Sequence, residues 1–151
     1  MRKRFFSIHL FLVLIFLFSC NGDINQAVKE LTKPKKELTK EERAQALKTV
    51  KSKFKDDPKK MARVDEYFEK KIKDPAERDA LLQVIALGTE YENKVEDILK
   101  KAQAEGKNLN SYSPEILALK TQLTDDLKNH NYTEKLFTKL GGEFINFVNG
   151  K

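Results

Sequence analysis

Helix-start signals recur at short intervals along this chain, and they constrain its fold more than any other feature. Two of them place proline directly after aspartate, so that a capping residue is followed by one suited to the first helical turn. Another has Thr39 three residues before Glu42, which is the spacing of a capping box. The predicted helix starts lie at Thr39, Asp57-Pro58, Asp74-Pro75, Ser113-Pro114 and Thr133.

Apolar residues follow each start with the spacing of an amphipathic helix. The first helix should run to about Phe54 and bury that ring together with Leu47 and Val50. The third should be the longest, from Pro75 to about Ala104, with Gly88 near its middle. A glycine there either permits close contact with a neighbouring helix or marks a bend, and we expect close contact. The remaining apolar faces are Met61, Val64, Phe68 and Ile72 in the second helix, Ile116, Leu117, Leu119, Leu123 and Leu127 in the fourth, and Leu136, Phe137, Leu140, Phe144, Ile145 and Val148 in the fifth.

This pattern predicts an all-α fold, because no segment alternates polar and apolar residues as a strand would. About five amphipathic helices joined by short loops make a small bundle, and residues 38–151 suffice for one such domain. Residues 20–37, which are rich in Lys, Asn and Thr, are expected to form a flexible tether before it. Gly141-Gly142 is a point at which the last helix could divide.

The N-terminal segment has the organisation of a bacterial lipoprotein signal. Basic residues at positions 2–4 precede an apolar run, residues 5–18, that leads into Leu17-Phe18-Ser19-Cys20. As a helix this run would be about 21 Å long, too short for a hydrocarbon core of about 30 Å. We therefore expect residues 1–19 to be removed as a signal peptide and Cys20, the chain's only cysteine, to be acylated. The alternative is an ordinary signal cleaved near Ser19, which would leave a free thiol.

A short signal rich in Phe, Leu and Ile is thus followed by the relaxed lipobox Leu17-Phe18-Ser19-Cys20 and by Asn21-Gly22. Together with the Lys- and Asn-rich helical body, this N-terminus resembles the plasmid-type outer-surface lipoproteins of Borrelia spirochaetes. The resemblance implies a lipid-anchored protein on the outer surface that binds complement regulators, matrix components or other host proteins. It does not assign a subfamily.

Charge is unevenly distributed over the part of the chain that follows the signal. Residues 21–73 hold sixteen Lys and Arg against ten Asp and Glu, whereas residues 74–151 hold ten against thirteen. The basic half is next to the predicted anchor, so it could face anionic lipid headgroups or a sulfated host polysaccharide. The simpler interpretation is a solvated surface, since 24 of the 29 basic residues are Lys. Nucleic acid is not an expected partner of an exported chain without aromatic or Arg-rich interleaving.

The sequence offers little for catalysis or metal binding. Once the signal is removed, His130 is the one remaining histidine, and only Cys20 could join it in a zinc site or a catalytic pair. Asp56-Asp57 and Asp125-Asp126 are paired carboxylates, but neither pair has the ligand spacing of a calcium loop. We therefore expect no enzymatic activity, no metal and no cofactor.

A cluster of basic residues on the predicted second helix is the candidate binding surface. Its members are Lys59, Lys60, Arg63, Lys70 and Lys71, most of which fall outside the apolar stripe of that helix. Acidic residues interleaved with them could neutralise much of their field through i, i+4 pairs. Two interpretations therefore stay open, a site for an acidic macromolecule and a plainly solvated helix face.

Two aromatic residues are candidate exposed contacts for a partner. Phe147 falls off the apolar line of the last helix, and Tyr132 lies in the polar segment before it. The other aromatic residues recur at helical spacing, which is more typical of a core than of a ligand groove.

These features predict a non-enzymatic lipoprotein, anchored in the outer membrane at the cell surface, that binds a host or partner macromolecule. The ligand classes considered are a host or envelope protein and a sulfated polysaccharide. The alternative is a structural lipoprotein on the periplasmic face that helps to hold an envelope assembly together.

Overall fold

The computed structural model describes residues 37–151, in which helices follow one another without a strand. The predicted all-α fold with five α-helices is confirmed for this part of the chain. The predicted signal peptide, Cys20 and the tether up to residue 36 lie outside the described residues. The elements are α3 (Lys40–Ser52), α4 (Pro58–Glu66), the π-helical turn η1 (Tyr67–Lys71), α5 (Pro75–Ala104), the 3-10 turn η2 (Leu109–Tyr112), α6 (Ser113–Asn129) and α7 (Glu134–Asn149).

Side-chain caps begin four of the five α-helices at the residues that the sequence indicated. At α3, the Thr39 hydroxyl accepts a hydrogen bond from the Glu42 N–H (3.2 Å), and the Glu42 carboxylate accepts one from the Thr39 N–H (2.8 Å). Asp57, Asp74 and Thr133 each accept a hydrogen bond from the backbone N–H three residues further on. Each cap satisfies a donor that the first helical turn leaves open. The start of α6 lacks such a bond and follows η2 directly.

Two helix boundaries differ from the prediction. α3 ends at Ser52 rather than near Phe54, although the Phe54 ring is buried as expected. The predicted second helix is an α-helix only to Glu66 and then widens into η1. In η1 the neighbouring side chains of Tyr67 and Phe68 are both buried and pack edge to face, with ring centroids 5.3 Å apart. The wider turn therefore coincides with the burial of two consecutive aromatic rings.

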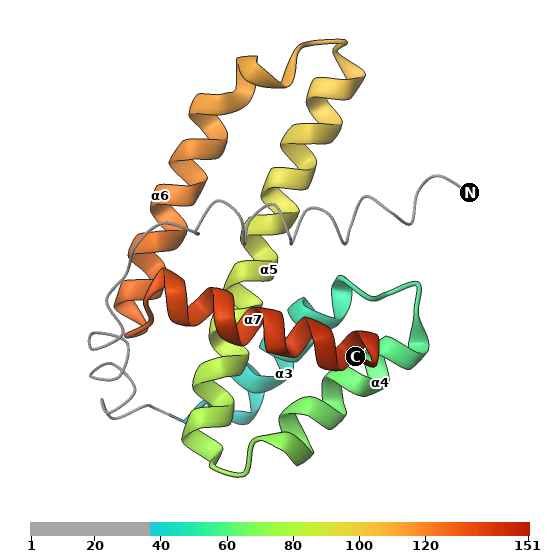
Figure 1. Cartoon of the computed structure of the whole chain (residues 1–151), viewed down its shortest axis with the longest axis vertical. Helices are drawn as coiled ribbons and strands as arrows, with labels where there is room; N and C mark the ends of the chain where they lie inside the picture. The colour runs from blue at the N-terminus through green and yellow to red at the C-terminus, as the bar shows by residue number, and fades with distance from the viewer. Residues whose placement is uncertain (1–36) are drawn as a thin grey trace.

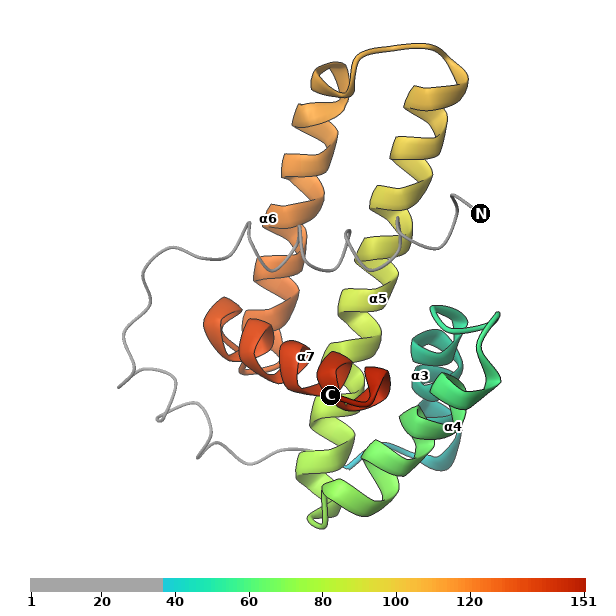
Figure 2. The ribbon, with the colours of Figure 1, turned by 45° about the vertical axis from the view of Figure 1, so that its right-hand side comes forward.

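α5 is the longest element, and the other helices are arranged along it (Figure 1). α3 packs against its first half, and α4 lies between α3 and α7. α6 runs antiparallel to the second half, so that α5 and α6 form a hairpin that extends beyond the rest of the described chain (Figures 1 and 2). α7 crosses α5 as one helix, so the predicted division at Gly141-Gly142 does not occur.

Three apolar clusters make up the core of residues 37–151, and α5 contributes to each of them. The first joins α3, α4, η1, α5 and α7, and the second joins α5, α6, α7 and the loop between the last two. The third lies inside the hairpin and has three buried members, Ile98, Ala102 and Tyr112. The first cluster contains Val50, Phe54, Val64, Tyr67, Phe68, Leu81, Leu82, Ile85, Ala86, Phe144 and Val148, and the second contains Val84, Tyr91, Leu123, Leu127, Tyr132, Leu136 and Phe137.

Two residue-level predictions have different outcomes. Gly88 in α5 lies directly under the ring of Phe137 in α7, so the predicted close helix contact is confirmed. Leu117, which was expected on the apolar face of α6, is 62% exposed instead. Leu123 and Leu127 are fully buried, and Leu117 lies on a different side of the same helix.

Candidate binding surface

The five residues of the predicted basic surface lie on α4 and η1. Lys59, Lys70 and Lys71 are exposed, whereas Lys60 and Arg63 are half-buried. Lys70 lies 3.7 Å from Glu66 in an exposed i, i+4 ion pair, which contributes little because water screens it. Lys59 and Lys60 form no ion pair among residues 37–151. Whether this surface binds a partner stays a prediction.

Arg63 and Lys71 approach the same aromatic ring. The guanidinium of Arg63 and the ammonium of Lys71 each lie 5.5 Å from the centroid of the Phe147 ring. Arg63 also reaches Gly150, which ends α7, where the helix dipole favours a cation. Arg63 and Lys71 therefore both contact α7 through Phe147, and Lys59, Lys60 and Lys70 are the members of the predicted surface without such a contact.

The expectation that Tyr132 is an exposed contact is wrong. Its side chain is 2% exposed and belongs to the second apolar cluster. The chain reverses at Asn131, where φ is +61°, and the Tyr132 N–H then donates to the Leu127 carbonyl (2.8 Å), which turns the ring inward. Phe147 is half-buried, and its ring centroid lies 5.3 Å from that of Tyr67. Phe147 thus offers only part of its ring to solvent.

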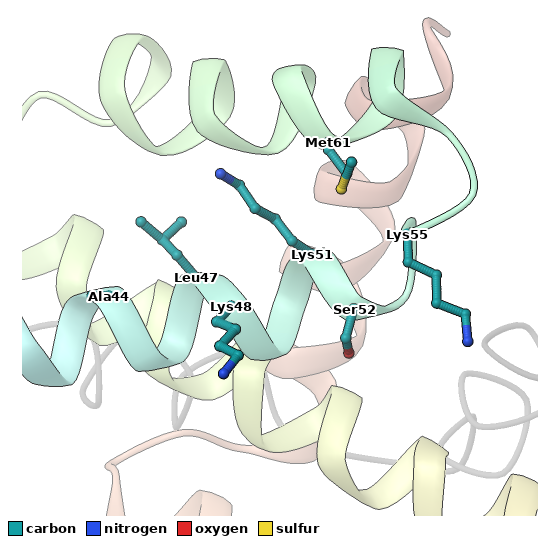
Figure 3. A pocket seen from close by; sticks show the side chains of 7 residues that line it. All are labelled: Ala44, Leu47, Lys48, Lys51, Ser52, Lys55 and Met61. Carbon is teal, nitrogen blue, oxygen red and sulfur yellow. The ribbon is translucent and has the colours of Figure 1, made fainter.

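An open groove lies between α3 and α4 (Figure 3). It offers about 510 Å³ of space. Leu47 and Met61 point into the gap from opposite helices, and Lys51 extends toward α4 (Figure 3). Lys48 and Lys55 point away from α4, along the other border of the groove. The residues that line this α3–α4 groove are Ala44, Leu47, Lys48, Lys51, Ser52, Lys55 and Met61.

A buried carboxylate fixes the start of the helical domain. The side chain of Asp79 in α5 is 0% exposed and accepts two hydrogen bonds from Arg43 of α3 (2.9 and 2.6 Å). It also accepts one from the Leu38 N–H (2.9 Å) and one from Arg78 (3.2 Å). Burial by itself would raise the pKa of the Asp79 carboxyl, but these hydrogen bonds outweigh it, and the pKa is lowered.

A second buried ion pair joins α3 to α5 further along. Lys53 pairs with Glu92, and the two side chains are 10% and 6% exposed. Burial raises the pKa of Glu92 to about 7, although the charge of Lys53 acts in the opposite direction. Burial likewise lowers the pKa of Lys53. Both effects follow from the cost of keeping a charge away from water.

Neither carboxylate was predicted as a buried site, although the sequence of α5 carries a signal for both. Asp79 lies three residues before the buried Leu82, and Glu92 lies seven residues after the buried Ile85, so both share the inward face of the helix. An acidic residue on an inward face indicates a buried partner. The partner itself could not be read from the sequence, because Arg43 and Lys53 lie 36 and 39 residues away.

The other predicted polar features have structural roles in the described chain. Asp57 caps α4, and Asp126 accepts a hydrogen bond from the Tyr91 hydroxyl (2.6 Å). His130 is half-buried at the end of α6, where its backbone N–H donates to carbonyls of that helix. Among residues 37–151, no three His, Cys, Asp or Glu side chains gather as a metal site would require. None of the helices described here has an apolar stretch that would cross a membrane.

No protein-family model, curated protein or solved structure matches this chain significantly. Its function is therefore inferred from the N-terminal sequence and from the geometry of the described residues.

Proposed function

We propose that this protein is a non-enzymatic lipoprotein that is anchored at the cell surface through acylated Cys20 and binds a host or partner macromolecule with its helical domain. The observation that supports it best is the lipobox Leu17-Phe18-Ser19-Cys20 after a short apolar run. In the helical domain, the Leu38 N–H donates a hydrogen bond to Asp79 of α5 (2.9 Å). This bond places the first residue of the domain beside the N-terminal end of α5, close to where the predicted tether ends.

α5 then leads away from that end. Its 30 residues correspond to about 45 Å of helix, and the tip of the α5–α6 hairpin lies at its far end (Figure 1). With the anchor at one end, the flanks of the bundle and the hairpin would stand clear of the membrane. This is a suitable arrangement for a protein that presents a binding surface to another macromolecule.

Two measurements on the bacterium that makes the protein test this proposal. Labelling with radioactive palmitate should mark the wild type and be lost in Cys20→Ala, whereas continued labelling of that variant would refute the anchor. Protease added to intact cells should degrade the wild-type protein, with a known periplasmic protein as the protected control. Full protection would instead support the structural lipoprotein on the periplasmic face.

A further inference from the structure

The geometry points to the α3–α4 groove as a docking site for an acidic amphipathic helix of a partner protein. This inference names a partner class for the proposed binding protein, and it rests on that proposal for the partner's access to the domain. It involves a different surface from the predicted cluster on α4 and η1, because none of the groove residues belongs to that cluster.

The groove follows one continuous stripe of α3. Its residues on that helix recur three or four positions apart, from Ala44 through Lys48 and Lys51 to the turn at Lys55. The helical part of this stripe, from Ala44 to Ser52, is about 12 Å long, which corresponds to about two turns of a bound helix. The groove is thus long enough for a short helix and not only for a single side chain.

The floor of the groove is apolar and adaptable. Leu47 and Met61 are half-buried, and both pack from outside onto the first apolar cluster. Their outer surfaces remain accessible between the two helices (Figure 3). An unbranched methionine adjusts readily to the shape of an apolar partner residue. A leucine or phenylalanine on one face of a partner helix would fit this floor.

The borders of the groove are basic. Three lysines line it, and no lining residue is acidic. Lys51 pairs with Asp65 of α4 (2.6 Å), whereas Lys48 and Lys55 are exposed and form no ion pair among residues 37–151. An acidic residue on the flank of a partner helix that faces Lys48 and Lys55 would therefore find an uncompensated ammonium group.

The helical walls of the groove favour a helical partner over an extended one. Both walls are helices, whose main-chain groups are bonded within the helix, so an extended peptide has no strand edge to pair with. A sulfated polysaccharide or an anionic lipid headgroup would use the lysines but would leave the apolar floor without a contact. An acidic helix with an apolar stripe would contact both the lysines and the apolar floor.

The methionine content of the chain provides a selective reporter. Met1 and Met61 are the only two methionines, and Met61 lies in the groove. The full chain is labelled with 13C at the methionine methyl groups, and Met61→Leu assigns the groove signal. The probe is a short synthetic helical peptide with leucines on one face and glutamates on the flank beside that face. Saturable movement of the Met61 methyl resonance is expected.

Charge variants separate this site from general electrostatic attraction. Lys48→Glu with Lys55→Glu should weaken binding of the acidic peptide at least tenfold and create affinity for the same peptide with lysine in place of glutamate. The matched control is Lys73→Glu with Lys139→Glu, which makes the same change in net charge at two exposed positions outside the groove. This control should bind the acidic peptide within about twofold of the wild type.

Three results would overturn the inference. One is a Met61 resonance that does not move with millimolar acidic peptide. Another is equal weakening by the groove variant and its control. The third is an equal Met61 response to heparin or to phosphatidylglycerol vesicles, which would assign the groove to a polysaccharide or a lipid. The titration uses purified protein, so failure of surface display would leave its outcome unaffected.

Discussion

The ring of Phe137 rests on Gly88 so closely that a β-carbon added at residue 88 would lie 2.5 Å from its Cζ atom. The ring is buried in the second apolar cluster, so making room for a β-carbon requires packed side chains to shift. Gly88→Ala should therefore lower the free energy of unfolding by about 1–3 kcal/mol, although alanine is the better helix former by up to about 1 kcal/mol. Urea denaturation followed by circular dichroism measures the difference.

Gly142→Ala is the matched control for that change. A β-carbon at residue 142 in α7 would have no neighbour within 4 Å. Without a clash, only the better helix propensity remains, and a gain of about 0.5–1 kcal/mol is expected. Equal effects of the two substitutions would show that the contact between Gly88 and Phe137 does not limit the packing of α7.

Asp79→Asn tests the hydrogen bonds of the buried carboxylate at the start of the domain. The variant loses charged hydrogen bonds to Arg43, so at pH 7 its unfolding free energy should fall by about 1.5–3 kcal/mol. The lowered pKa of Asp79 means that its stabilisation is complete above the unfolded value of 3.8 and is lost as the pH falls through the folded value. Urea midpoints of wild type and variant should converge at acid pH, and a constant gap would contradict this account.

Glu92→Gln tests the buried pair with Lys53. The pH dependence of stability that Glu92 causes has the opposite sign to that of Asp79. The folded pKa of Glu92, about 7, lies above the unfolded value of 4.5, so between these values the folded state holds a proton that the unfolded state has released. The contribution of Glu92 to stability should therefore decline as the pH rises from 4.5 to 7, by on the order of 1–3 kcal/mol. Urea unfolding at several pH values should show this slope in the wild type and a flatter profile in the variant.

The predicted basic surface can be tested without disturbing α7. Lys59, Lys60 and Lys70 are changed to Gln together, and Arg63 and Lys71 are kept because both contact Phe147 of α7. If the surface attracts polyanions, the variant should elute from heparin at a lower salt concentration than a control in which the exposed residues Lys100, Lys128 and Lys139 are changed to Gln. Equal elution of the two variants would leave the surface with no role beyond solubility.

Local signals were sufficient to predict the helices. Four helices begin with a side chain that accepts a hydrogen bond from the backbone N–H three residues further on, at Thr39, Asp57, Asp74 and Thr133. Such short-range contacts can be predicted from the sequence. The close contact at Gly88 was also predicted, because a glycine in the middle of a long helix has few other uses.

Long-range packing limited the prediction of the candidate sites. The α3–α4 groove depends on how Met61 approaches Leu47 across a turn, and periodicity alone does not define the angle between two helices. Tyr132 was misplaced for a related reason. Its loop is polar in sequence, and the positive φ of Asn131, which turns the ring inward, depends on how the chain leaves α6. The role of Arg63 at Gly150 likewise arises only when α4 and α7 meet.

α5 is one helix by geometry, but its two halves should differ in cooperativity. Around Leu82 it is covered by α3 and α7, whereas beyond Ile98 only α6 and η2 accompany it, over a cluster of three buried residues. The outer half can therefore open while the inner half stays folded. Amide hydrogen exchange should be slowest near Leu82 and accelerate toward Ala102. A partner that binds the hairpin tip would then slow amide exchange at the tip. It would leave the exchange rates of the inner half, which are set by global unfolding, unchanged.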